Sequence, residues 1–247
     1  MDIPVFTRSK NKQEPKQRLN FITMFANQKG GVGKSTLCLS YATYLTEVKG
    51  IRLVVIDADP QHSTYRKWKQ DCDDHPNAKP LYNVVTFDDL DNEQETIDFI
   101  KDLRKQDYSF IIDTPGNMGL AGLIHLAHAV DVIATPVQYE KLCARSTNAF
   151  INFVLDLCDK VSPNELKKIA FIPNMHQKRW GNKEESIFVK QTEEDYSNIG
   201  LLLPRIPLSP EMRRLSIYGL TNKQKEIVGP CFEKLCDFTY NQQQPDK

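Results

Sequence analysis

The chain has 247 residues and a mass of 28.4 kDa, which fits one large domain or two small ones. Its 32 basic residues balance its 32 acidic ones, so the chain as a whole has no net charge to draw it to DNA or acidic lipid. A mean hydropathy of −0.48 and the absence of a long apolar run exclude a conventional transmembrane helix. The N-terminal segment has no apolar core followed by a small-residue cleavage site, so we expect a cytoplasmic protein.

The two ends of the chain differ in composition from the rest. Residues 1–18 are rich in basic residues and have almost no apolar residues after Phe6, which predicts a mobile basic arm. The polar segment 241–247 predicts a disordered tail. We expect a single folded domain over residues 19–240.

Within that domain, short apolar runs alternate with helical periodicity. The expected strands are Asn20–Ala26, Arg52–Ile56, Tyr82–Val85, Phe110–Ile112, Asp131–Thr135 and Ile169–Pro173. The expected helices are Lys34–Val48, Ser63–Asp71, Glu93–Lys105, Ala121–Ala129, Ser146–Leu157 and Glu226–Phe238. Strands joined through helices pair in parallel, because each crossover returns the chain to the same edge. The sequence therefore predicts an α/β fold with a doubly wound, mostly parallel sheet and helices on both faces.

A glycine-rich loop, NQKGGVGKST (27–36), follows the first expected strand and opens the first expected helix. Its glycines let successive backbone N–H groups point at phosphate oxygens, and the helix N-terminus adds its dipole. Lys34 is placed to reach the β- and γ-phosphates, and the Ser35 hydroxyl to bind Mg²⁺. The candidate nucleotide-binding residues of this loop are Gly30, Gly31, Val32, Gly33, Lys34, Ser35 and Thr36.

Carboxylates end two of the later strands, at the edge where open parallel sheets bind ligands. Asp57 and Asp59 belong to the segment DADPQ, and one of them can hold the water shell of a metal while the other orients an attacking water. Asp113 ends the apolar run FIID and is placed to complete a Mg²⁺ shell through water, or to accept a hydrogen bond from Ser35. The candidate metal residues are thus Ser35, Asp57 and Asp113.

The loop departs from the strict G-x-x-x-x-G-K-[ST] pattern, because Gln28 stands where the first glycine would be and Lys29 follows it. With this K-G-G-x-G-K-S form, the deviant Walker A motif, and with the DADPQ and DTPG segments, the chain resembles the ParA/MinD group of P-loop ATPases. The resemblance covers roughly residues 19–219. It is closest to the small plasmid- and chromosome-partition form that has no N-terminal helix-turn-helix domain.

This resemblance implies ATP and Mg²⁺ as cofactors and hydrolysis of ATP to ADP and phosphate. It implies that Lys29 reaches the phosphates of a second subunit across an ATP sandwich dimer, and that Lys34 and Asp59 serve the reaction. Asn174 falls where the family has the asparagine that contacts the adenine edge, and Pro207 falls in the segment that packs on the base.

The resemblance also implies a DNA-segregation function. The ATP-bound homodimer would bind DNA without sequence preference and stay with the nucleoid, until a centromere-binding partner of the ParB type stimulates hydrolysis. Such binding needs clustered basic residues. The candidates are Lys178, Arg179, Arg205, Arg213 and Arg214.

Two other functions share these motifs. A MinD-like, membrane-associated positioning ATPase would need a C-terminal amphipathic helix with a basic flank. Segment 226–238 has an apolar face, but NQQQP follows it, so we expect a core helix and no membrane partner. A metabolite-directed P-loop enzyme of the dethiobiotin-synthetase type would need a polar pocket for its acceptor, and the sequence shows no recognisable one.

Overall fold

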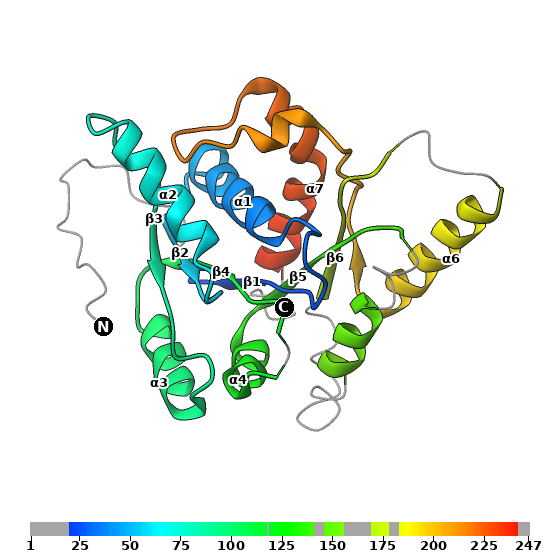
Figure 1. Cartoon of the computed structure of the whole chain (residues 1–247), viewed down its shortest axis with the longest axis horizontal. Helices are drawn as coiled ribbons and strands as arrows, with labels where there is room; N and C mark the ends of the chain where they lie inside the picture. The colour runs from blue at the N-terminus through cyan, green and yellow to red at the C-terminus, as the bar shows by residue number, and fades with distance from the viewer. Residues whose placement is uncertain (1–19, 118, 141–145, 156–168, 178–182, 242–247) are drawn as a thin grey trace.

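A computed structural model describes residues 20–117, 119–140, 146–155, 169–177 and 183–241 (Figure 1). The strands in these ranges are β1 (Ile22–Phe25), β2 (Leu53–Asp57), β3 (Asn83–Thr86), β4 (Ser109–Asp113), β5 (Val132–Val137), β6 (Ile169–Pro173) and β7 (Leu201–Leu202). The helices are α1 (Lys34–Lys49), α2 (Ser63–Asp74), α3 (Glu93–Arg104), α4 (Ala121–Ala129), α6 (Lys183–Ile199), α7 (Asn222–Asn241) and the 3₁₀ helix η2 (Pro210–Arg213). Residues 146–155 are also helical.

The strands form one sheet in the order β3-β2-β4-β1-β5-β6-β7, and every paired strand runs parallel to its neighbour. In Figure 1, α1, α2 and α7 lie on one side of the sheet, and α3 and α4 lie on the other. This arrangement confirms the predicted doubly wound α/β fold. It also covers both faces of the sheet, as buried parallel strands require.

The strands alternate between two apolar cores. In β2, Leu53 and Val55 pack in the core that includes α1 and α7, whereas Val54 and Ile56 pack in the core that includes α3 and α4. Successive side chains of a strand point to opposite faces, so a continuous apolar run is what a strand covered on both sides requires.

Helix α1 is the most deeply enclosed of the labelled helices, with an unbroken buried stretch from Leu37 to Leu45. Tyr41 packs edge-on against Phe232 of α7, with ring centroids 5.1 Å apart. The backbone N–H of Gly50, in the left-handed conformation, closes the helix on Leu45 O. Because α1 is fixed between the sheet and α7, the loop that precedes it is held at the edge of the sheet.

Each helix and strand expected from the sequence has an observed counterpart in the described ranges, with ends that differ by a few residues. Helix α6 and the short strand β7 were not predicted. Only Thr192 and Tyr196 of α6 are buried, so this helix lacks the apolar periodicity that predicts a helix.

The predicted arm (1–18) and nearly all of the predicted tail (241–247) lie outside the described residues. Helix α7 ends at Asn241, the first residue of that tail. No helix in the described part of the chain is long and apolar enough to cross a bilayer.

Candidate nucleotide-binding site

The candidate site lies at the carboxyl edge of the sheet, beside β1. From β1 the chain moves outward to β2 and β3 and returns through β4, and β5 then continues on the other side of β1. Such a reversal of strand order leaves a crevice between the loops that follow the strands. The glycine-rich loop of residues 26–33 fills this position, between β1 and α1.

Two glycines give this loop its shape. Gly31 has φ 79° and Gly33 has φ 94°, both in the left-handed region that side chains disfavour. A Cβ at Gly33 would lie 2.4 Å from Asn174 Nδ2, and that amide donates to Val32 O at 2.8 Å. The end of β6 therefore packs directly on the loop, and the absence of a side chain at Gly33 makes the contact possible.

The start of the loop is held by the buried side chain of Asn27. Its Nδ2 donates to Pro136 O at 2.8 Å and to Thr147 Oγ1 at 2.9 Å, while its Oδ1 accepts from the backbone N–H of Lys29 at 3.0 Å. The loop is thus anchored to the end of β5, and its conformation is set before any ligand binds.

Lys34 begins α1 and lies among the strand-end carboxylates. Burial lowers the pKa of its ammonium group, and Asp113 and Asp59 partly oppose this change. A Cβ at Gly116 would lie 3.9 Å from Lys34 Nζ and 3.1 Å from Gln28 O. The segment after β4 therefore packs closely against the glycine-rich loop.

Asp113, at the end of β4, has one carboxylate oxygen engaged and one unpartnered. Thr64 Oγ1 donates to Oδ2 at 2.7 Å, while the buried Oδ1 has no hydrogen-bond partner. Burial raises the pKa of Asp113 from 3.8 to about 6, and the nearby hydroxyls of Ser35 and Thr64 partly offset this rise. A carboxylate oxygen without a partner, beside serine and threonine hydroxyls, is a donor set that suits a hard cation such as Mg²⁺.

Asp57 and Asp59 shape the loop after β2. Both oxygens of the buried Asp57 accept backbone N–H groups, from Asp59 at 3.2 Å and from Tyr65 at 2.8 Å. Burial raises the pKa of Asp57, and these two N–H groups partly oppose the rise. Asp59 is half-buried, and its Oδ1 accepts from the N–H of Gln61 at 2.9 Å. Asp57 thus holds the loop, whereas Asp59 lies close enough to Lys34 for its charge to raise the pKa of that ammonium group.

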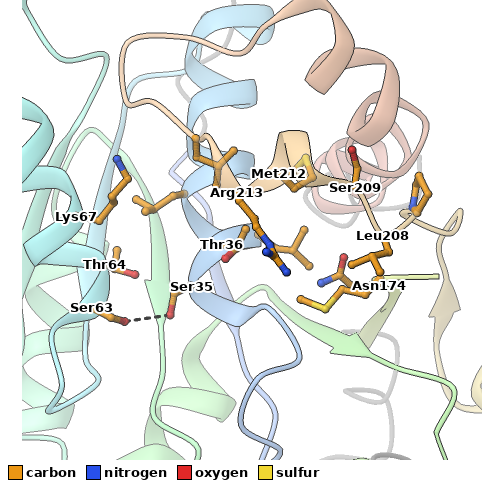
Figure 2. A pocket seen from close by; sticks show the side chains of 15 residues that line it. Ser35, Thr36, Ser63, Thr64, Lys67, Asn174, Leu208, Ser209, Met212 and Arg213 are labelled. Carbon is orange, nitrogen blue, oxygen red and sulfur yellow. Dashed lines mark hydrogen bonds between the residues drawn. The ribbon is translucent and has the colours of Figure 1, made fainter. Parts of the chain in front are cut away.

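A cavity of about 340 Å³ extends from this phosphate-binding end across α1 (Figure 2). Ser35 and Thr36 border one end, where the Ser35 and Ser63 hydroxyls lie 3.4 Å apart. Asn174 and Pro207 line the wall, so the structure brings these two predicted residues to the same cavity as the loop. The segment from Leu208 to Leu215, which contains η2, lines another side of the cavity.

A family model described as the CobQ/CobB/MinD/ParA nucleotide-binding domain matches residues 23–222. The chain belongs to this family. No curated protein sequence matches it. The family's nucleotide-binding function agrees with the loop and the cavity described above.

Several solved structures share the fold at low sequence identity, and at this level they show the fold alone. A plasmid partition protein from Borrelia burgdorferi B31, bound to AMPPNP, has 18% identity and a TM-score of 0.66 over 90% of this chain and 99% of its own. McdA from Cyanothece has 17% identity and a TM-score of 0.64, over 92% and 100%. Cobyrinic acid a,c-diamide synthase from Mycobacterium smegmatis, with a bound ATP analogue and magnesium, has 21% identity and a TM-score of 0.63. The match covers 93% of this chain and 98% of that one.

The three described residues that the sequence predicts to contact DNA have different surroundings. Lys178 and Arg179 lie outside the described residues. Arg205 is engaged by Glu193, with its Nε and a terminal nitrogen donating to the two carboxylate oxygens at 2.8 and 2.7 Å. Arg213 lines the cavity, and Arg214 is exposed. Arg213 and Arg214 are both exposed, and Arg214 lies 3.9 Å from a carboxylate oxygen of Glu211.

Sequence reasoning missed two polar residues that support the site. Thr64 donates to Asp113, and Gln138 Nε2 donates to Gly31 O at 3.4 Å from the end of β5. A hydroxyl in the first turn of the helix after a strand-end carboxylate could have pointed to Thr64. No local pattern distinguishes Gln138, because its partner is a backbone carbonyl far away in the sequence.

Proposed function

We propose that this protein is a partition ATPase of the ParA type. It binds ATP and Mg²⁺, closes into an ATP sandwich homodimer that binds DNA without sequence preference, and is reset by hydrolysis. One observation carries the nucleotide part of this proposal. The glycine-rich loop packs against Asn174 on one side and against Gly116, three residues after Asp113, on the other.

The residues present fit both cofactors. The left-handed glycines leave the loop N–H groups accessible to phosphate, and Lys34 offsets phosphate charge. Ser35 and the unpartnered oxygen of Asp113 would hold Mg²⁺, which when bound neutralises charge on the phosphates. Asp57, whose oxygens are occupied by backbone N–H groups, would support the metal through water.

Asp59 is assigned to position the attacking water. It is half-buried in the loop after β2, and its charge acts on Lys34, so it lies near the phosphate-binding end without being enclosed there. Because phosphoryl transfer depends mostly on positioning and on neutralisation of charge, a carboxylate at this place suits that role.

Lys29 is assigned to the partner subunit's nucleotide. Its backbone N–H is fixed by Asn27, and the residue is half-buried. A lysine that is partly open to solvent in this loop is able to contact a second subunit. The assignment follows from the deviant Walker A motif and implies ATP-dependent dimerisation.

DNA binding and a ParB-type partner are the less direct parts of the proposal. They are supported by the fold shared with the Borrelia plasmid partition protein. Arg214, with Lys178 and Arg179, supplies the candidate DNA contacts. Nucleoid association would follow from such binding.

The test is binding to a random-sequence DNA duplex and to anionic liposomes, each with ADP, ATP and a non-hydrolysable analogue. Asp59→Ala should retain nucleotide binding, lose turnover and hold the closed state. Asp59→Asn is the matched variant, because it keeps the acceptor for the Gln61 N–H and removes only the charge. We expect DNA binding that needs ATP and weakens with salt.

The other outcomes would contradict the proposal in distinct ways. Liposome binding with ATP would indicate a MinD-like function. Nucleotide binding without DNA or liposome binding would indicate a metabolite-directed enzyme, an activity that the same fold also carries in the Mycobacterium synthase. Hydrolysis by Asp59→Ala at the parent rate would remove Asp59 from the reaction.

A further inference from the structure

Two consecutive arginines at the end of η2 point in different directions. The Arg213 side chain lines the cavity, and in Figure 2 it points inward between Thr36 and Asn174. The Arg214 side chain is 76% exposed and lies 3.9 Å from Glu211. Their charges are equal and adjacent in the sequence, yet their surroundings differ.

The backbone around Arg213 is held at both ends. Ser209 caps η2 by accepting from the N–H of Glu211 at 3.3 Å, and Pro210 occupies the first turn. The buried side chain of Gln224, in the first turn of α7, donates to Glu211 O at 2.9 Å and to Arg214 O at 3.3 Å. The direction of the Arg213 side chain is therefore a property of a supported segment.

Packing strengthens this support. Met212 and Leu215, on either side of the two arginines, are partly buried against the core formed with α1 and α7. These contacts restrict the movement of the segment between the two side chains, which also border the cavity. Arg213 is left facing the cavity from a fixed backbone.

The chemistry of the cavity suits an anion next to Arg213. Among the described residues that line it there is no aspartate or glutamate, and its other cation, Lys67, is already paired with Asp71. At the Thr36 end, the N-terminus of α1 contributes its positive dipole. A guanidinium that faces such a cavity without a carboxylate is suited to a phosphate group.

The order of residues along the cavity indicates which phosphate. Ser35, next to Lys34 in the sequence, lines the end that serves the β- and γ-phosphates, and Asn174 lines the end assigned to the base. Arg213 enters between these two ends, where a nucleotide that spans them has its α-phosphate.

We propose that Arg213 is a nucleotide-binding residue that contacts the α-phosphate, and not the DNA contact that the sequence predicts. This proposal rests on the nucleotide-binding part of the proposed function and is independent of DNA binding. It assigns the loop from Leu208 to Leu215 to nucleotide recognition in both the ATP and the ADP state.

The test is calorimetric titration of the parent, Arg213→Met and Arg213→Lys with ADP and with a non-hydrolysable ATP analogue. Loss of a charge-assisted hydrogen bond should weaken the Met variant roughly tenfold for both nucleotides, because both carry the α-phosphate. The Lys variant should fall between the two. Lys223→Met is the matched control, since it removes a cation 3.8 Å from Glu211 outside the cavity.

Two results would overturn the proposal. If Arg213→Met binds ADP as the parent does but loses ATP-dependent DNA binding, Arg213 is a DNA contact, as the sequence predicts. Weakening confined to the ATP analogue would indicate a contact with the γ-phosphate. Because Arg213 is exposed, thermal unfolding of the ligand-free variant should match the parent, which separates binding from folding. A parent that binds nucleotide but not DNA would contradict the partition function alone.

Discussion

The two ends of the candidate nucleotide site are built in different ways. The phosphate end comes from one continuous loop and from carboxylates that directly follow strands, and its key groups are enclosed by neighbouring polar partners. The nucleoside end is assembled from the end of β6, the segment after β7 and η2, which are well separated along the chain. Motifs specify the phosphate end, whereas tertiary packing specifies the nucleoside end.

The largest effect should come from the phosphate end. Lys34→Ala removes the main cation of the loop and leaves phosphate charge uncompensated, so we expect nucleotide affinity to fall by at least about 100-fold. Titration with ADP and an ATP analogue measures this loss. Near-parent affinity of Lys34→Ala would contradict the assignment of the loop.

Lys29→Ala should spare nucleotide binding by the monomer and weaken the ATP-dependent dimer. Analytical ultracentrifugation with the ATP analogue measures the dimer.

A substitution where the two ends meet should have a smaller effect. Gly33→Ala forces a side chain on a residue with φ 94° and puts a Cβ 2.4 Å from Asn174 Nδ2. We expect a loss of about 1 to 3 kcal/mol in the free energy of unfolding and weaker nucleotide binding. Chemical denaturation measures the first quantity. Gly30→Ala, with no atom within 4 Å of its Cβ, should leave stability near that of the parent; equal losses in both variants would contradict the Gly33–Asn174 contact.

The smallest effect concerns the buried carboxylate of the phosphate end. The pKa of Asp113 is raised from 3.8 to about 6, so the folded protein binds this proton more tightly than the unfolded chain does. The free energy of unfolding that this proton contributes is lost as the pH rises through about 6. At pH 7, Asp113→Asn should therefore stabilise the ligand-free protein by about 1 to 2 kcal/mol, with the gain disappearing near pH 4. Denaturation at the two pH values measures the difference.

The same substitution should remove the magnesium dependence of nucleotide binding, since an amide in place of the Asp113 carboxylate would lack the charge of the unpartnered oxygen. Asp57→Asn is the contrasting variant. Both Asp57 oxygens accept N–H groups, so an amide there leaves one donor facing another and should destabilise the fold. Stabilisation by both substitutions would contradict the different roles given to the two carboxylates.

The sequence was sufficient for the parts of the site that depend on local order. The loop at 27–36 and the strand-end carboxylates follow from position, because parallel strands bring their carboxyl ends to one edge. The direction of a surface side chain does not follow from position. Arg205, Arg213 and Arg214 have the same charge in the sequence, but tertiary contacts give the first a carboxylate and turn the second into the cavity. Helix α6 was missed because most of its side chains face water.

The side chain of Gln224 links η2 to the first turn of α7. Besides holding η2, it forms a capping box at the start of α7, in which its N–H donates to Thr221 Oγ1 at 3.2 Å and its Oε1 accepts from the N–H of Thr221 at 2.8 Å. If the first turn of α7 frays, the segment that carries Arg213 loses its anchor. We therefore expect the amide protons of η2 and of the first turn of α7 to exchange as one opening unit, and a nucleotide that contacts Arg213 to slow the exchange of both.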